Sequence, residues 1–253
     1  MQMKIFVTNL NGFDDRRHWI KTQFKKFDLD FEFIDCFDGR KWEDDDVKKI
    51  VTNEFFDYHK RKESWVTKGA IAATLTHVER IYKRMVEENI EYALCCEDDI
   101  KLSKDFKEKL QIIDQYINRV SFEGVLLLHF FLSQSTKLSD LEKVQLDRQT
   151  AVYKLPRKFK VGSGAGYIIS RKTAKQLIQD QSPIKRIADC WNDHPIDNVN
   201  FAYPVMIRTG VFSTTLGYQE NILSKITKLI PENIRMFFRM KKLIRKEENN
   251  IQR

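Results

Sequence analysis

Residues 91–99 read Glu-Tyr-Ala-Leu-Cys-Cys-Glu-Asp-Asp, an apolar run that ends at three consecutive carboxylates. The apolar residues predict a buried strand over 91–96. In open α/β sheets, ligands bind beyond the carboxyl ends of the strands, where loops converge. Because side chains alternate along a strand, we expect Glu97 and Asp99 to point one way and Asp98 the other. Such hard oxygen ligands favour Mg²⁺ or Mn²⁺, so the stretch predicts a metal site, with a solvated turn as the alternative.

The composition is that of a packed globular chain. Hydrophobic residues make up 42% of the 253 residues and aromatic residues 12%, which excludes wholesale disorder and allows one large α/β domain. The four cysteines show no Cys-x-x-Cys spacing, which disfavours a zinc site and a disulfide framework. The first apolar run is too short for a signal peptide, and no apolar stretch reaches the roughly 18 residues of a membrane span. We therefore expect a cytoplasmic protein.

The positive charge is concentrated at the C-terminal end. The net charge is +8, and residues 225–253 carry nine Lys or Arg against three Glu. Apolar residues alternate with these basic residues, as in an amphipathic helix at an anionic membrane surface. A helix that packs on the domain is the alternative. Nucleic acid is not expected as a partner, because the basic residues cluster at one terminus and no RNA-binding or zinc-finger signature accompanies them. The predicted organisation is a domain over 1–222 and a basic helical tail over 223–253.

Segments typical of strands and helices alternate along the chain, which predicts an α/β fold. The strand at 124–129 is expected to lie beside the strand at 91–96, and the polar stretch 133–150 is expected to be a loop. The helix over 67–88 shows the clearest periodicity, with apolar residues spaced four, three, four and three apart. The remaining expected strands span 4–8, 31–34 and 161–170, and the remaining helices span 14–27, 103–118 and 171–181.

Several short motifs follow one another along the first hundred residues. They are Ile-Phe-Val-Thr-Asn-Leu at 5–10, Asp-Arg-Arg at 15–17, Phe-Ile-Asp at 33–35, Asp-Gly-Arg at 38–40, Lys-Gly-Ala-Ile-Ala-Ala-Thr-Leu-Thr-His at 68–77 and the acidic triplet at 97–99. Together they resemble glycosyltransferase family 25, which contains bacterial lipooligosaccharide galactosyl- and glucosyltransferases and collagen galactosyltransferases. Two departures are small in volume: Ala72-Ala73 stands where the family usually has Gly-Cys, and Thr76 stands where it has Ser.

The resemblance implies a GT-A-type, Rossmann-like domain with a mixed sheet that binds a nucleotide sugar, in which Glu97-x-Asp99 plays the part of the DXD motif. It implies a metal-assisted, inverting transfer of galactose, with glucose as the alternative, from a UDP-sugar to lipooligosaccharide. A β-1,4-galactosyltransferase-like reaction is expected. The implied cofactor is Mn²⁺ or Mg²⁺, which would stabilise the charge left on UDP. With the basic tail, the expected location is the inner face of the cytoplasmic membrane.

An inverting reaction needs one carboxylate base. Asp189, which precedes an aromatic position in Ile-Ala-Asp-Cys-Trp, is the favoured candidate, and Asp197 in His-Pro-Ile-Asp is its rival. A helix N-cap is the ordinary alternative for either residue. Trp191 is predicted to stack on the acceptor sugar.

Five residues are assigned to the donor. Asn9 ends the first expected strand and Arg16 follows it, so both are expected to face uridine or diphosphate. His77 is expected to donate to phosphate or to order the acidic loop, with an ordinary helix histidine as the alternative. Asp98 is assigned with them. Gly164, between two further glycines, would let the backbone approach the ligand, with a bulged strand as the alternative.

Two other classes remain open. A metal-dependent nucleotide-sugar hydrolase would use the same carboxylates but would need no acceptor pocket. A catalytically silent adaptor at the membrane surface would depend on the basic tail alone.

Overall fold

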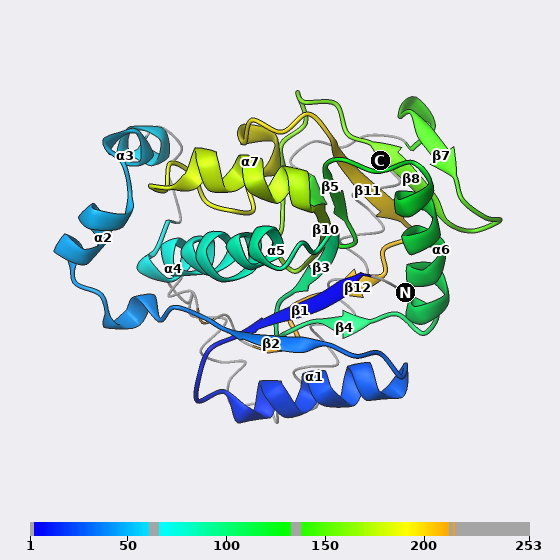
Figure 1. Ribbon diagram of the computed structural model, residues 1–253, viewed down its shortest axis with the longest axis horizontal. Helices are drawn as coiled ribbons and strands as arrows, with labels where there is room; N and C mark the ends of the chain where they lie inside the picture. The colour runs from blue at the N-terminus through cyan, green and yellow to red at the C-terminus, as the bar shows by residue number, and fades with distance from the viewer. Residues whose placement is uncertain (1–2, 61–65, 133–137, 213–214, 216–253) are drawn as a thin grey trace, which may run out of the picture.

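The computed structural model describes residues 3–60, 66–132, 138–212 and 215. Its centre is an eight-stranded mixed sheet in the order β2-β1-β3-β10-β5-β11-β8-β7, with helices on both faces (Figure 1). The strands of this sheet are β1 (Lys4–Asn9), β2 (Glu32–Asp35), β3 (Tyr92–Cys96), β5 (Val125–Leu127), β7 (Lys143–Gln145), β8 (Ala151–Lys154), β10 (Gly166–Ser170) and β11 (Val199–Tyr203). This architecture confirms the predicted mixed α/β class.

Two small sheets and the helices complete the described fold. The small sheets pair β4 (Lys101–Leu102) with β12 (Ile207–Arg208) and β6 (Phe131–Leu132) with β9 (Val161–Gly162). The α-helices are α1 (Asp14–Lys26), α2 (Asp44–Ile50), α3 (Asn53–Lys60), α4 (Lys68–Thr76), α5 (Lys83–Glu87), α6 (Phe106–Arg119) and α7 (Arg171–Gln181). A π-helical turn, η2 (His77–Tyr82), joins α4 to α5, and short 3₁₀ turns occur at η1 (Gly39–Lys41), η3 (Leu138–Asp140) and η4 (Trp191–Asp193).

The alternation of side chains along the central strands builds two cores. In β1, Ile5 and Val7 face the layer of α1 and α6, whereas Phe6 faces the layer of α5 and α7 (Figure 1). β3 is buried at every position, as its apolar sequence predicts. A third cluster joins α2 and α3 to α4 and to Ile184 and Ile187. Helices therefore cover β1 and β3 on both faces of the sheet.

The prediction that the strand at 124–129 lies beside the strand at 91–96 is wrong. β10 lies between β3 and β5 and runs antiparallel to both. A continuous apolar run shows that a strand is buried on both faces, but it does not show which strand it pairs with. The insertion of β10 carries the glycine-rich segment at 162–166 beside the carboxyl end of β3.

The helix predicted over 67–88 is interrupted by the π-helical turn. Its predicted apolar face is buried at Ile71, Val78, Tyr82 and Met85, whereas Leu75 is only partly buried. The interruption begins at His77. π-Turns inside α-helices occur frequently at functional sites, because the extra residue redirects a side chain.

The polar stretch 133–150 is not wholly a loop, because it contains η3 and the edge strand β7. The β7 side chains are exposed, so this strand lacks the apolar pattern that would predict it. The predicted basic tail at 223–253 and its boundary with the domain lie outside the described residues. Among the described helices, none combines the length and apolar character that crossing a bilayer requires.

Candidate active site

A cleft of about 740 Å³, counted with the part open to solvent, lies where β1, β2 and β3 end. The segments that follow the three strands contribute to its walls, and α4 closes it from the side. The lining includes Thr8, Leu10, Arg16, Cys36, Phe37, Asp38, Gly39, Arg40, Gly69, Ala73, Thr76, His77 and the acidic triplet at 97–99. The structure thus places the predicted acidic site at the sheet edge where open α/β folds bind ligands.

Asp98 is held by Asn9 of β1 and Arg16 of α1, two residues predicted from the sequence to bind the sugar donor. Asn9 Nδ2 donates to Asp98 Oδ2 at 2.7 Å, and Arg16 Nη1 to Oδ1 at 2.6 Å. All three residues are buried. Burial raises the pKa of Asp98, although the charge of Arg16 and the two hydrogen bonds act against this rise. In this structure Asn9 and Arg16 fix the acidic loop, and Asp98 compensates the charge of Arg16, which also lines the cleft. Their role toward the diphosphate remains a prediction.

Asp99 is anchored to the segment that follows β12. Thr209 Oγ1 donates to Asp99 Oδ1 at 2.8 Å, and Gly210 N donates to Oδ2 at 3.2 Å. The backbone is tied at the same point, because Val211 N donates to the Asp99 carbonyl at 3.2 Å. Thr209 carried no signal in the sequence, since it lies more than a hundred positions from Asp99 and only the fold brings the two together.

The Glu97 side chain lies against the glycine-rich segment. A Cβ atom at Gly164 would lie 3.1 Å from Glu97 Oε1, 3.9 Å from His77 Nε2 and 4.0 Å from Asp189 Cβ. Gly164 is therefore the point around which these three predicted site residues gather. Within the described residues, no hydrogen bond or ion pair reaches the Glu97 carboxylate. Burial, followed by the negative charges of Asp99, Asp189 and Asp98, raises the pKa of Glu97 well above its ordinary value.

Substitution of Gly164 by Ala is expected to lower kcat/KM by about tenfold, because the new methyl group displaces the Glu97 carboxylate by a few tenths of an ångström. The matched control is Gly162→Ala. A Cβ there meets only the Asp189 carbonyl, at the ordinary contact distance of 3.5 Å. Steady-state kinetics of both variants check the prediction. Equal values of kcat/KM in the two variants would contradict a role for Gly164 in the site.

Asp189 enters this group from the chain between α7 and η4. Its Oδ1 atom is buried and has no hydrogen-bond partner among the described residues. Burial raises the pKa of Asp189. Its rival Asp197 lies at the surface, where its carboxylate accepts from Arg157 Nη2 at 2.9 Å. Neither aspartate is among the lining residues of the cleft, but Asp189 lies beside Gly164 and Glu97, which lines it. The geometry therefore favours Asp189 of the two candidate bases.

The predicted stacking of Trp191 on an acceptor sugar is corrected. The ring is fully buried, with 0% of the residue exposed. Its Nε1 atom donates to the Ser163 carbonyl at 2.9 Å, and the ring packs edge-on against Tyr167 with centroids 4.6 Å apart. The sequence could not show this burial, since an aromatic residue beside a candidate base can face either the ligand or the core. Trp191 ties the Asp189 segment to the glycine-rich segment.

His77 lies on the cleft wall at the start of the π-helical turn. Its Nδ1 atom shares a hydrogen bond of 2.8 Å with the Tyr167 hydroxyl, which lies 2.8 Å from the Tyr82 hydroxyl. Burial lowers the pKa of His77 to about 4, so the ring is neutral at pH 7. A neutral ring can form a hydrogen bond with a ligand but brings no positive charge to a phosphate. The role of His77 toward the donor remains a prediction.

Two features near β2 complete the cleft. Thr76 Oγ1 accepts from Phe37 N at 3.0 Å and ties the segment after β2 to α4, which the Ser of related motifs could also do. Gly39 packs on α4 so closely that a Cβ atom would lie 2.2 Å from the Lys68 carbonyl oxygen. The glycine of the Asp-Gly-Arg motif is thus required by packing.

The carboxylates of the cleft fit a divalent cation in part. Glu97 and Asp99 are neighbouring carboxylates, and the raised pKa of Glu97 reflects burial and negative charges that a cation would offset. Among the described residues, however, no group of three or more His, Cys, Asp or Glu is arranged to hold a metal ion. Mg²⁺ commonly binds to one or two carboxylates together with phosphate oxygens and water. Glu97 and Asp99 are therefore a partial ligand set, which other ligands would have to complete around a cation.

The mixed eight-stranded sheet with helices on both faces is consistent with a Rossmann-like glycosyltransferase fold. The family model for glycosyltransferase family 25 (LPS biosynthesis protein) matches residues 2–199, and the chain belongs to this family. Family membership supports an enzyme that transfers a sugar.

Curated relatives agree with this assignment. A glycosyltransferase 25 family member from Aedes aegypti is 29% identical over 203 residues, which cover 76% of this chain and 31% of the relative. Procollagen galactosyltransferase 1-A from Xenopus laevis is 23% identical over 209 residues, covering 77% and 32%. A Haemophilus influenzae protein that is provisionally named a glycosyltransferase is 27% identical over 174 residues, covering 69% and 56%. The matched region thus spans about a third of the two animal relatives and about half of the bacterial one.

Proposed function

We propose that this protein transfers a hexose, with galactose favoured over glucose, from a UDP-sugar to a terminal sugar of a lipooligosaccharide core, with inversion at the anomeric carbon. The observation that carries the proposal is the convergence of Glu97, Asp189 and His77 around Gly164, beside Asp99, in a member of a sugar-transferring family. The Xenopus relatives are named as procollagen galactosyltransferases, and the family description refers to LPS biosynthesis. These names support the sugar and the acceptor class.

In the proposed mechanism, Asp189 accepts the proton of the acceptor hydroxyl as that oxygen attacks the anomeric carbon of the donor. The new bond forms on the face opposite the bond to the diphosphate, which breaks and leaves UDP. Burial raises the pKa of Asp189, which strengthens it as a base near neutral pH. Glu97 and Asp99 would hold a divalent cation, and this cation would supply charge neutralisation to the leaving diphosphate.

Neighbouring residues would support this mechanism. Asn9 and Arg16 hold Asp98 and so keep the acidic loop in one conformation. Gly164 leaves room for Glu97 beside Asp189. His77, neutral and within the cleft wall, is available to exchange a hydrogen bond with the donor.

The test is the release of UDP from a panel of UDP-sugars in the presence of Mn²⁺, with and without lactose-like and glucose-terminated acceptors. We expect one donor to give release that an acceptor stimulates, together with an acceptor that has gained one hexose by mass spectrometry. Release that is independent of any acceptor, with free sugar as the product, would instead identify a nucleotide-sugar hydrolase. Absence of release with every donor and acceptor, including purified lipooligosaccharide, would contradict the proposal.

The proposed location is the inner face of the cytoplasmic membrane. It depends on the basic tail at 223–253, whose alternation of apolar and basic residues suits an anionic lipid surface. An amphipathic acceptor such as lipooligosaccharide would be present at the same surface.

A further inference from the structure

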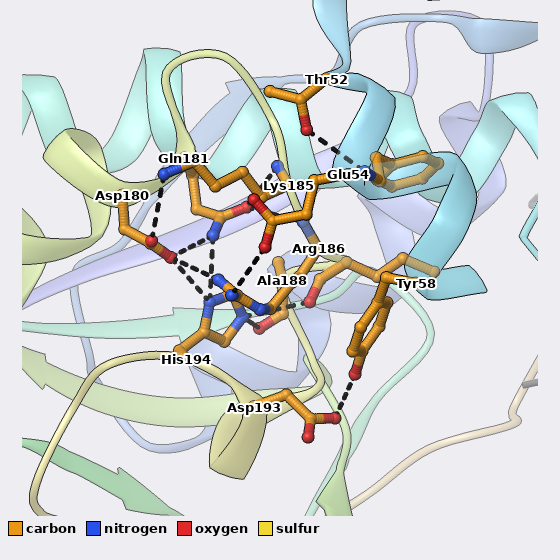
Figure 2. A network of polar contacts seen from close by, with 12 residues as sticks. Thr52, Glu54, Tyr58, Asp180, Gln181, Lys185, Arg186, Ala188, Asp193 and His194 are labelled. Carbon is orange, nitrogen blue, oxygen red and sulfur yellow. Dashed lines mark hydrogen bonds and ion pairs between the residues drawn. The ribbon is translucent and has the colours of Figure 1, made fainter. Parts of the chain in front are cut away.

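A largely buried polar cluster lies next to Ala188, the residue that precedes Asp189 (Figure 2). We call it the His194 cluster; it consists of Asp180, Gln181, Arg186 and His194. His194 is 4% exposed, and Gln181 is 2% exposed. The proposed mechanism uses none of these four residues, although they surround the segment that carries the base.

The His194 ring binds the backbone immediately before Asp189. Its Nε2 atom lies 3.1 Å from the Ile187 carbonyl oxygen and 3.2 Å from that of Ala188. Since a carbonyl oxygen can only accept, Nε2 must carry the hydrogen. One N–H group is thereby shared by two consecutive carbonyls, and the residue that follows them is the proposed base.

The other side of the ring is held by the end of α7. Gln181 Nε2 lies 3.4 Å from His194 Nδ1, and Asp180 Oδ2 lies 3.8 Å from the same atom. Arg186 Nη1 donates to Asp180 Oδ2 at 3.0 Å. Burial alone would raise the pKa of Asp180, but the nearby His194 ring, the Gln181 amide and the charge of Arg186 lower it to about 2. A fixed carboxylate and a fixed amide therefore orient the ring.

Further contacts hold the segment on either side of these carbonyls. Gln181 Oε1 accepts from Lys185 N at 3.1 Å and from Arg186 N at 3.0 Å. Ala188 N donates to Thr74 Oγ1 on α4 at 3.0 Å. The His194 contact differs from these, because it joins the two carbonyls next to the base directly to a side chain that α7 orients.

We infer that His194 is a positioning residue for Asp189: through Nε2–H and the Ile187 and Ala188 carbonyls, it sets the place of the Asp189 carboxylate beside Glu97 and Gly164. This inference rests on the proposed role of Asp189 as the base. It gives the buried cluster at the end of α7 a function in sugar transfer without any contact to the substrate. A misplacement of a reacting group by about 1 Å can lower a rate about 10²-fold.

A matched pair of variants tests the inference. The amide nitrogen of His194→Gln can take the place of Nε2, whereas that of His194→Asn corresponds to Nδ1 and is too short to reach the two carbonyls. We expect His194→Asn to lower kcat by roughly 10²-fold, with little change in KM for the donor, and His194→Gln to recover most of the loss. Tyr58→Phe is the control, because its hydroxyl donates to Asp193 on the same segment but not near the two carbonyls (Figure 2).

The Asp189→Asn background separates positioning from general destabilisation. If His194 acts through the Asp189 carboxylate, His194→Asn lowers the residual rate of Asp189→Asn by much less than it lowers the wild-type rate. Equal rates for the Gln and Asn variants, a loss confined to KM, or an undiminished loss in the Asp189→Asn background would each overturn the inference. If Asp189→Asn itself retains the wild-type rate, the proposed base is wrong, which is a different failure and is recognised from that single variant.

Discussion

Asp189→Asn is expected to lower kcat for sugar transfer by about 10²- to 10⁴-fold while leaving donor affinity within a few-fold of wild type. The substitution keeps the shape of the side chain but removes its capacity to accept a proton. Asp189 Oδ1 is buried without a hydrogen-bond partner among the described residues, so the substitution breaks no hydrogen bond of that atom within them. Steady-state kinetics and calorimetric titration of the UDP-sugar measure the two quantities separately.

The same prediction includes a dependence on pH. Because burial raises the pKa of Asp189, the base is protonated over a wider acidic range than an ordinary aspartate. We therefore expect kcat/KM to rise with pH as Asp189 loses its proton and to fall as the pH is lowered through that pKa. The residual activity of Asp189→Asn should lack this step.

Asp197→Asn serves as the control, because its carboxylate pairs with Arg157 at the surface. It should retain nearly full activity. The reverse result, with a large loss for Asp197→Asn and little for Asp189→Asn, would transfer the role of base to Asp197 and contradict the geometry described above.

Glu97→Gln and Asp99→Asn are expected to lower activity by about 10²-fold and to abolish the thermal stabilisation that Mn²⁺ and UDP together give the wild type. For a chain of this size, each kcal/mol of binding stabilisation raises the melting temperature by roughly 2–4 °C. Differential scanning fluorimetry measures this shift without any need for turnover. Asp45→Asn is a matched control, since Asp45 is an exposed acidic residue paired with Lys48.

Glu97→Gln should also change the stability of the protein in the absence of ligand. Burial and the neighbouring negative charges raise the pKa of Glu97, so its ionised form costs stability in the folded protein. This cost grows as the pH rises above the ordinary pKa of 4.5, and Glu97→Gln removes it. We expect Glu97→Gln to melt at a higher temperature than wild type at neutral pH without ligand. A lower melting temperature, or stabilisation by Mn²⁺ and UDP that persists in both variants, would contradict a cation site at these carboxylates.

The sequence predicted the elements of the fold better than their arrangement. The apolar run at 92–96 and the periodicity of 68–87 are local patterns, and the structure confirms a buried strand and a nearly continuous helix there. Strand pairing depends on the whole chain, so the sequence did not predict that β10 lies beside β3. The exposed edge strand β7 has no apolar pattern, which explains its assignment to a loop.

For the site, the sequence predicted residues that the structure brings together, but it did not predict which of them contact one another. The acidic triplet, His77 and Gly164 meet as their motifs suggest. Asn9 and Arg16 carry polar groups suited to a phosphate, and the structure shows that both also donate to Asp98, a contact that depends on the fold and not on any local pattern. The burial of Trp191, which prevents its ring from stacking on a sugar, likewise depends on the whole fold.

The most direct test of the central claim is the anomalous scattering of Mn²⁺ in crystals grown with UDP. The account predicts one strong peak within coordination distance of the Glu97 or Asp99 carboxylate, with the diphosphate oxygens completing the shell. A diphosphate bound away from the cleft at the ends of β1, β2 and β3, or bound there with Mn²⁺ remote from both carboxylates, would contradict it.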